Sequence, residues 1–177
     1  PKMDSQFVMT IIAKDRPGLV ESLSRIVGDH QGNWLESRMA HLGGQFAGIL
    51  RASVPAGSAE KFLAALRGLE SSGIKINVTA DSAGVATSGR RAELSLVGQD
   101  RPGIVRQIAQ ALARNGVNVE ELSTETSSAP MTGETLFHTQ AEIHVPESCS
   151  ISDLRAEMEK IASDLMVDIK LHELTHS

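Results

Sequence analysis

The sequence is poor in aromatic residues and cysteine, and it has no excess of basic charge. Aromatic side chains make up 3% of the 177 residues, tyrosine is absent, and the formal net charge is −5. Because non-specific nucleic-acid binding depends on a basic surface, this charge argues against a direct nucleic-acid partner. The single cysteine, Cys149, excludes an intramolecular disulfide and is typical of a reducing compartment, so we expect a cytoplasmic protein.

Long apolar runs are missing as well. No segment approaches the roughly 18–20 apolar residues that a membrane-spanning helix needs. Residues 1–6 also lack the apolar centre of a signal peptide. A hydrophobic content of 41% is still enough for a packed core. We therefore expect a globular protein with no membrane partner.

An internal repeat organises the chain. Residues 15–20, Asp-Arg-Pro-Gly-Leu-Val, recur as Asp-Arg-Pro-Gly-Ile-Val at residues 100–105, an offset of 85. A later Val-Pro pair recurs with an offset of 91, so the second copy holds an insertion of six residues. The small and polar segment between the copies is typical of a linker. The repeat predicts a first domain at residues 3–82, a linker at 83–90 and a second domain at 91–175.

Each copy shows the same order of secondary-structure patterns. Alternating apolar residues predict strands, and apolar residues three or four apart predict amphipathic helices. In the first copy the predicted elements are a strand at residues 7–13, a helix at 19–27, strands at 34–42 and 46–54, a helix at 59–69 and a strand at 74–78. With right-handed crossovers, the order βαββαβ gives a four-stranded antiparallel sheet with both helices on one face. The predicted fold class is α+β, with two ferredoxin-like domains.

One face of each predicted sheet has no helix to cover it. We expect this face to pack against the other copy or against a second chain. A homodimer is therefore one expected assembly.

The turn between the first strand and the first helix of each copy is the best candidate for a binding site. Backbone N–H groups at a helix start have no partner within the helix, and together with the helix dipole they attract an anion. Gly18 and Gly103 lack a Cβ atom, so a small carboxylate could approach the main chain closely. Pro17 fits the first position of the helix, where a missing N–H costs nothing.

An asparagine follows the aspartate of each turn by 18 residues, Asn33 in the first copy and Asn118 in the second. Both are predicted at the opposite end of the helix from the turn, at the start of the neighbouring strand. An asparagine side chain donates and accepts hydrogen bonds, as a ligand with an ammonium and a carboxylate group requires. Pairing of two copies would bring one turn near the other copy's asparagine. The same residues are also typical of a plain turn and helix start.

Other groups of reactive side chains are weaker candidates. The six histidines lack the spacing of a zinc site, so we expect neither a metal nor a cofactor. Cys149 has no neighbour in the sequence that would activate it. Glu120 and Glu121 would resemble an acid–base pair, but alternation predicts them on opposite faces of their strand. No nucleophile, phosphate-loop or dinucleotide motif is present, so we do not expect an enzyme.

The sequence resembles tandem ACT domains, the small-molecule-sensing modules of amino-acid metabolism. The Asp-Arg-Pro-Gly turn and the later asparagine match the family pattern in both copies, and the resemblance covers essentially the whole chain. Residues 33–40, Asn-Trp-Leu-Glu-Ser-Arg-Met-Ala, with Gly44 and Phe46 after them, are similar to the first copy of the glycine cleavage system transcriptional repressor family. Residues 129–133, Ala-Pro-Met-Thr-Gly, followed by Leu-Phe at 136–137, are similar to its second copy.

The resemblance implies a regulator that binds no DNA itself. Such proteins act on a DNA-binding activator of the glycine cleavage genes, with glycine or a similar small amino acid modulating the contact. ACT domains bind amino acids at interfaces between domains, through the turn and the asparagine. This implies a ligand-binding role for six residues: Asp15, Gly18, Asn33, Asp100, Gly103 and Asn118. Trp34 stands where a small aliphatic residue is commoner, which would narrow the first pocket.

Two other interpretations remain open on the sequence. The first is a ligand-free structural or interaction module, in which the turns are only turns and the asparagines brace the fold. The second is a regulatory subunit of a separate metabolic enzyme, because ACT domains often accompany catalytic domains.

Overall fold

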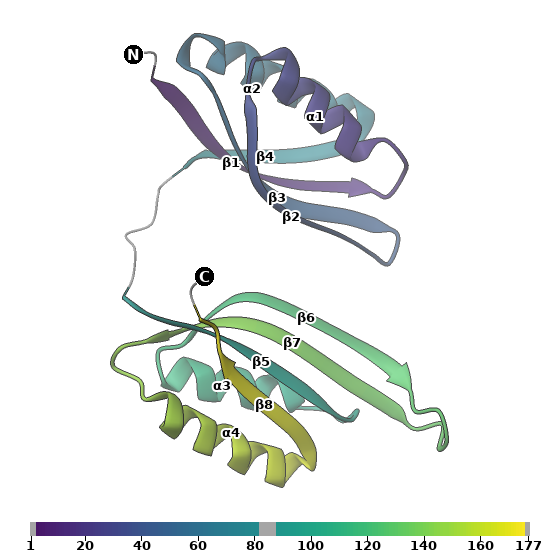
Figure 1. The fold of residues 1–177 in the computed structure, drawn as a ribbon. Helices are drawn as coiled ribbons and strands as arrows, with labels where there is room; N and C mark the ends of the chain where they lie inside the picture. The colour runs from purple at the N-terminus through teal and green to yellow at the C-terminus, as the bar shows by residue number, and fades with distance from the viewer. Residues whose placement is uncertain (1–2, 82–87, 176–177) are drawn as a thin grey trace. The chain divides into compact units, whose positions relative to one another are not determined.

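The structure is a computed structural model that describes residues 3–81 and 88–175. The chain divides into two units, Pro1–Ala83 and Gly84–Ser177, which we call domain 1 and domain 2. In each domain two helices lie against one face of a sheet (Figure 1). Residues 82–87 lie outside the described residues, and with them most of the expected linker at 83–90. Gly89 already belongs to the first strand of domain 2.

Domain 1 has the order of elements that its apolar patterns predict. These elements are β1 (Asp4–Lys14), α1 (Leu19–Asp29), β2 (Asn33–Leu42), β3 (Gln45–Pro55), α2 (Ala59–Gly68) and β4 (Ile74–Ala80). Two short 3₁₀ helices flank α2, namely η1 (Ala56–Ser58) and η2 (Leu69–Ser72). The strands form an antiparallel sheet in the order β2-β3-β1-β4.

Domain 2 repeats this architecture. Its elements are β5 (Gly89–Gln99), α3 (Ile104–Arg114), β6 (Asn118–Ser128), β7 (Thr135–Pro146), α4 (Ile151–Leu165) and β8 (Val167–Glu173). The antiparallel sheet has the order β6-β7-β5-β8, which matches that of domain 1 strand for strand. The prediction of two α+β, ferredoxin-like domains is confirmed.

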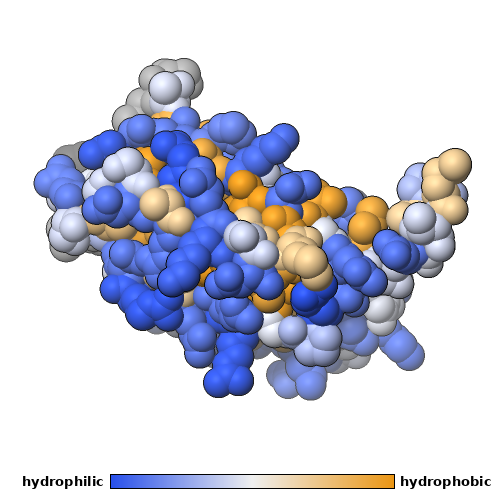
Figure 2. Space-filling model, turned by 90° about the horizontal axis from the view of Figure 1, so that it is seen from below, coloured by the Kyte–Doolittle hydropathy of each residue, from blue (hydrophilic) through white to orange (hydrophobic). Residues whose placement is uncertain are grey.

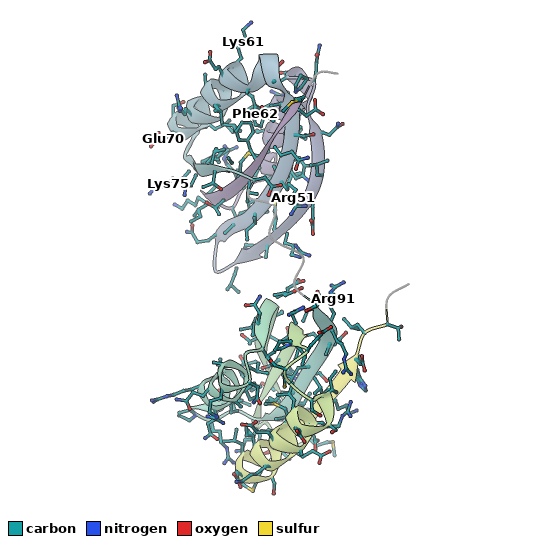
Figure 3. The ribbon with its side chains drawn as sticks, turned by 90° about the vertical axis from the view of Figure 1, so that its left-hand side faces the viewer. Arg51, Lys61, Phe62, Glu70, Lys75 and Arg91 are labelled. Atoms are coloured by element: carbon teal, nitrogen blue, oxygen red, sulfur yellow. The ribbon has the colours of Figure 1, made fainter. Side chains whose placement is uncertain are left out.

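The periodicity of the apolar residues decides which face of each sheet the helices cover. On β1, Met9 and Ile11 alternate with exposed residues and are buried against the helices. On α1, Leu23 lies on the same buried stripe as its apolar neighbours one turn before and after. Phe62 from α2 is fully buried between the helix and the sheet (Figure 3). Burial of each such side chain contributes about 1.5–3 kcal/mol to folding.

The six-residue insertion of the second copy lies in the β6–β7 hairpin, whose connection is four residues longer than that between β2 and β3 and whose strands are each one residue longer. In domain 1 only Gly43 and Gly44 connect β2 to β3, with φ of 59° and 80°, as a two-residue hairpin turn requires. In domain 2 residues 129–134 make this connection, and the N–H of Gly133 donates to the carbonyl of Ala129 at 3.1 Å. The insertion therefore lengthens one hairpin and leaves the core of the fold unchanged.

Both domains contain a β-bulge that the sequence patterns do not predict. In β2 the pairing with β3 shifts between Trp34 and Glu36, and in β6 the matching extra residue is Glu120. A bulge breaks the alternation of side chains. The prediction that Glu120 and Glu121 face opposite sides is therefore wrong. Glu120 Oε2 lies 3.9 Å from Arg91 Nε on the helix-free face, and Glu121 lines a shallow pocket on that face.

Candidate functional site

Glycines Gly18 and Gly103 are the N-cap residues of α1 and α3. Gly18 has φ 90° and ψ 2°, and Gly103 has φ 94° and ψ −2°. This left-handed conformation has no steric cost for glycine. Pro17 therefore precedes the helix, and the prediction that it takes the first helical position is wrong. At both glycines no other described atom lies within 4 Å of the point where a Cβ would stand, so this side of the turn is open.

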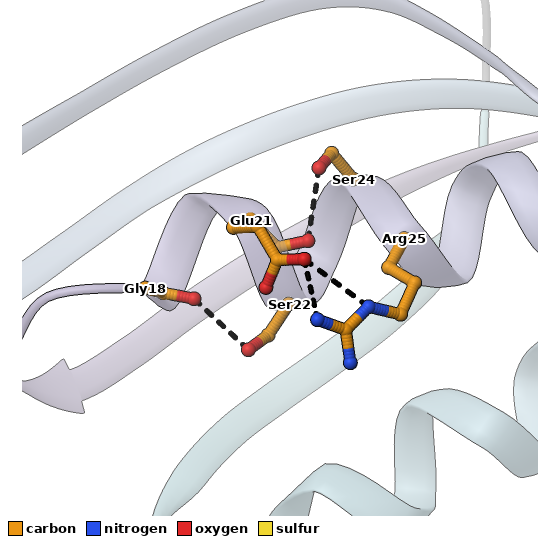
Figure 4. Close-up of polar contacts among 5 residues, drawn as sticks. All are labelled: Gly18, Glu21, Ser22, Ser24 and Arg25. Atoms are coloured by element: carbon orange, nitrogen blue, oxygen red, sulfur yellow. Dashed lines mark hydrogen bonds and ion pairs between the residues drawn. The ribbon is translucent and has the colours of Figure 1, made fainter.

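The first turn of α1 and of α3 presents amides without a side-chain cap. The hydroxyl of Ser22 donates to the carbonyl of Gly18 at 2.9 Å (Figure 4), and the N–H of Ser22 donates to the same carbonyl at 2.9 Å. The N–H of Gln107 donates to the carbonyl of Gly103 at 3.1 Å. No described side chain caps either helix, whereas the hydroxyl of Ser150 caps α4. The amides that precede Ser22 and Gln107 can therefore bind an anion.

The two turns differ in charge. Glu21 lies in the first turn of α1 and forms an ion pair with Arg25 (Figure 4), which raises the pKa of the Arg25 guanidinium. The first turn of α3 holds no acidic residue, and Arg106 takes the matching position. A carboxylate repels an incoming anion and a guanidinium attracts one. The turn of domain 2 is therefore the better anion site on electrostatic grounds.

The aspartates anchor each turn to the neighbouring hairpin. The N–H of Asp15 donates to the carbonyl of Gly44 at 3.0 Å. The N–H of Asp100 donates at 2.8 Å to the carbonyl of Thr135, the matching residue of the second hairpin. In domain 1 the Asp15 carboxylate also lies 3.5 Å from Nε2 of His41 on β2. The aspartate main chain thus has a structural role in both domains.

The asparagines lie at the other end of each sheet from the turns. Asn33 begins β2 and pairs with Ser53, which in turn pairs with Gln6 near the start of β1. The turn follows Lys14 at the end of β1, about 26 Å away along the strand at 3.3 Å per residue. Asn118 begins β6 in the same way. The predicted placement at opposite ends is confirmed, and no single domain brings its turn and its asparagine together.

A groove lies in domain 2 between α3 and the β6–β7 strands. It has a volume of about 40 Å³ and is lined by Leu94, Val105, Ile108, Ala109, Leu112, Val119, Leu122, Thr139 and Ala141. Thr139 Oγ1 is buried there with no hydrogen-bond partner among the described residues. In domain 1 Trp34 stands at the position of Val119, packs against the core and donates from Nε1 to Ser37 Oγ at 2.9 Å. Figure 2 shows apolar side chains reaching the surface in a patch edged by hydrophilic ones.

Two arginines on the helix-free faces form ion pairs with carboxylates of their own domain. Arg51 on β3 lies 3.2 Å from the carboxylate of Asp81 and 3.5 Å from that of Glu36. Arg91 on β5 forms an ion pair with Glu142 in addition to its contact with Glu120. Arg51 and Arg91 are labelled in Figure 3. These carboxylates thus neutralise neighbouring arginines, which is a structural role.

The remaining reactive groups do not converge. No described group of three histidine, cysteine, aspartate or glutamate side chains could hold a metal ion. Cys149 is buried, and burial together with the carboxylates of Asp153 and Glu157 raises the pKa of its thiol. A protonated thiol is a poor nucleophile. In the part of the chain that the structure describes, no helix combines the length and apolarity needed to cross a membrane.

Two family models, both described as an ACT domain, match the chain. One covers residues 5–79 and the other residues 92–147. The chain belongs to the ACT-domain family. Because one match falls on each domain, the protein is a tandem ACT-domain protein, as the repeated turn and asparagine predict.

Similar proteins include chains of the same length and organisation. The structure of an unknown protein from Galdieria sulphuraria is 32% identical, with a TM-score of 0.87 over 98% of this chain and 100% of that one. A protein provisionally described as a glycine cleavage system transcriptional repressor is 20% identical, with a TM-score of 0.68 over 98% and 99% of the two chains. The UPF0237 protein MK1213 of Methanopyrus kandleri is 33% identical over 79 residues, 45% of this chain and 82% of that protein.

Two features of the candidate site lie outside the residues that the motifs predict. Arg106 changes the charge of the second turn. This difference could have been predicted from the sequence, because Arg106 matches Glu21 at the repeat offset of 85. The buried hydroxyl of Thr139 has no such signal, because only the packing of α3 against the sheet leaves it without a partner.

Proposed function

We propose that this ACT-domain regulatory protein responds to a small amino acid, glycine or a similar one, and acts by contact with another protein. It binds no DNA itself and represses the glycine cleavage genes through a DNA-binding activator. The observation that carries the proposal is the uncapped glycine turn, which is present in both domains with nearly equal φ and ψ.

The proposed ligand site combines groups from two ACT domains. The amides at Gly18 or Gly103 bind the carboxylate, because they carry the positive end of the helix dipole. The side chain of Asn33 or Asn118 accepts from the ammonium group and donates to the carboxylate. Since turn and asparagine lie at opposite ends of one domain, a second ACT domain completes the site. Asp15 and Asp100 hold the turns in place through their main-chain bonds.

Regulation follows from the same geometry. A ligand that bridges two domains favours the arrangement in which turn and asparagine face each other. The partner protein recognises one arrangement. The ligand therefore changes the protein's affinity for the partner by the difference between the ligand's own affinities for the two arrangements. Each 1.4 kcal/mol of that difference changes the partner's affinity about tenfold.

The glycine cleavage role rests on two stretches of sequence. Residues 33–40 and 129–133 are similar to that repressor family, and the second stretch lies in the connection between β6 and β7. The full-length likeness to the provisionally described repressor agrees in fold. A separate metabolic enzyme is the alternative partner, and co-purification of an enzyme with the chain would favour it.

The test is calorimetric titration of the full-length protein with glycine, serine and the other amino acids. Asn33→Ala and Asn118→Ala are the site variants, and Gln110→Ala, an exposed amide on α3, is the matched control. We expect binding that either site variant weakens by about tenfold or more and that the control leaves unchanged. If the second turn dominates, as its charge predicts, Arg106→Glu weakens binding further.

Silence across the whole panel would overturn the proposal in favour of a ligand-free interaction module. In that case Asn33→Ala and Asn118→Ala would only lower the unfolding temperature. The main-chain bonds of Asp15 and Asp100 are the observation that favours this second candidate, because they explain the turn without a ligand.

A further inference from the structure

A second groove lies in domain 1 between α2 and the edge strand β4, on the side of the domain away from β2. Its volume is about 320 Å³, at the lower end of the range for binding pockets in proteins. Its apolar lining includes Phe7, Leu63, Leu66 and Val78, and Arg67 contributes a guanidinium group. Arg67 forms no ion pair with any described residue. The groove therefore combines apolar side chains with the polar residues Asn77 and Thr79 and with a guanidinium that has no ion pair among the described residues.

One wall of this groove is the main chain of an unpaired strand. β4 is the last strand of its sheet, and β1 is its only neighbour among the described strands. The N–H of Asp81 donates to Gln6 of β1 at 3.0 Å. In an antiparallel pair the bonded residues alternate with residues whose N–H and carbonyl groups point away from the partner strand. By this alternation the main-chain groups of Ile76, Val78 and Ala80 point outward, along the groove.

In domain 2 a side chain of the same domain bonds to one outward carbonyl of the matching edge. Leu171 on β8 pairs with Leu94, and Val78 on β4 pairs with Met9. Because Met9 and Leu94 match at the repeat offset of 85, Leu171 and Val78 hold equivalent positions on the two edges. The guanidinium of Arg155 on α4 donates to the carbonyl of Leu171 at 3.2 Å.

Domain 1 lacks this cover. If the buried residues of the two helices are aligned, Phe62 with Leu154 and Leu66 with Met158, Arg155 falls on Leu63. Leucine has no group that could bond a carbonyl. An exposed strand edge is a template for pairing with another chain, and proteins commonly cover or charge such edges. Of the two matching edges, that of domain 2 thus has a side chain bonded to an outward carbonyl, and that of domain 1 borders the groove.

We propose that domain 1 binds an extended segment of a partner protein along β4, as a fifth strand of its sheet. The main chain of the segment bonds to Ile76, Val78 and Ala80. Every second side chain of the segment enters the groove and is apolar, since successive side chains of a strand alternate. An acidic side chain of the segment pairs with Arg67. The groove needs no ligand at the glycine turns, and the amino-acid response needs no groove.

Selection from a displayed library of random octapeptides on the full-length protein tests this proposal. The enriched peptides should alternate apolar residues and carry an acidic one. Leu63→Arg, which copies the cover of domain 2, and Val78→Pro, which removes an outward N–H where an edge strand tolerates proline, should each weaken their binding about tenfold or more. Leu171→Pro on β8 is the matched control and should leave binding unchanged.

Hydrogen exchange supplies a second readout. A bound peptide should slow exchange at the amides of Val78 and Ala80. Melting curves of the variants check that they remain folded, and an amino-acid titration of Leu63→Arg separates this groove from the proposed ligand site. The proposal fails if no peptide is enriched, or if the enriched peptides bind Leu63→Arg as well as they bind the unaltered protein.

Discussion

Replacement of Gly18 by alanine should destabilise domain 1 through backbone strain alone. At φ 90° an L-residue places its Cβ close to its own main chain, at a cost of about 1–2 kcal/mol. No described neighbour lies within 4 Å of that Cβ, so packing neither adds to this cost nor relieves it. The free energy of unfolding should therefore fall by about 1–2 kcal/mol.

The sole tryptophan makes this effect measurable in one domain. Trp34 is half-buried against the core of domain 1, so its fluorescence in urea reports the unfolding of that domain. With a slope of about 1–2 kcal/mol per molar urea, Gly18→Ala should lower the midpoint by about 1 M. Gly103→Ala should leave the urea midpoint of the tryptophan fluorescence unchanged. It should lower the urea midpoint of domain 2, measured by far-ultraviolet circular dichroism.

Gly28→Ala is the matched control, because it should raise the free energy of unfolding of domain 1 where Gly18→Ala should lower it. Gly28 lies within α1, with no described atom within 4 Å of its added Cβ. Alanine there should stabilise the domain by about 0.5–1 kcal/mol through helix propensity. A Gly18→Ala midpoint equal to that of Gly28→Ala would refute the argument from backbone strain.

Three further predictions concern other contacts. Hydrogen bonds, of which that from Arg114 has the largest effect, lower the pKa of Glu157. The stabilisation from these bonds is therefore present above the usual carboxyl pKa and disappears as the pH falls through the lowered pKa of Glu157. Glu157→Gln should therefore flatten the acid dependence of domain 2 stability, and superimposable acid titrations would contradict this. Cys149 should react much more slowly with Ellman's reagent in the native protein than in urea; equal rates would disprove its burial. Gly48→Ala should cost about 1–3 kcal/mol, because its Cβ would lie 2.6 Å from the main-chain carbonyl oxygen of Arg38 on β2; an unchanged urea midpoint would show that the strands adjust freely.

The fold was predictable because the repeat and the periodicity agree. The Asp-Arg-Pro-Gly turn marks the same boundary twice, so each element was predicted from two stretches of sequence. The alternation through Met9 and Ile11 fixed the buried face of β1, and a helical stripe through Leu23 fixed that of α1. Local patterns and the final packing give the same answer in these elements.

Features that depend on one residue's exact backbone were not predictable. Pro17 is compatible with the first helical position, and only the left-handed φ of Gly18 moves the helix start beyond it. The bulge at Glu120 has no residue signature, because nothing in an alternating run shows where an extra residue is tolerated. The error over Glu120 and Glu121 follows from this bulge.

The candidate site was predictable only in its parts. The sequence placed Asn33 and Gly18 at opposite ends of α1, and the structure agrees. The open edge of β4 was outside the reach of sequence patterns, because it depends on a tertiary contact from Arg155 that has no counterpart at Leu63.

The most direct test of the central claim is an NMR titration of the full-length protein with glycine. A ligand that bridges a turn and an asparagine must perturb both ends of the sheets. We predict shifts at the backbone amides around Gly18 or Gly103 and, at the same glycine concentrations, at the side-chain amide of Asn118 or Asn33. Shifts at the turns alone, or no shift at millimolar glycine or any other amino acid, would contradict the account.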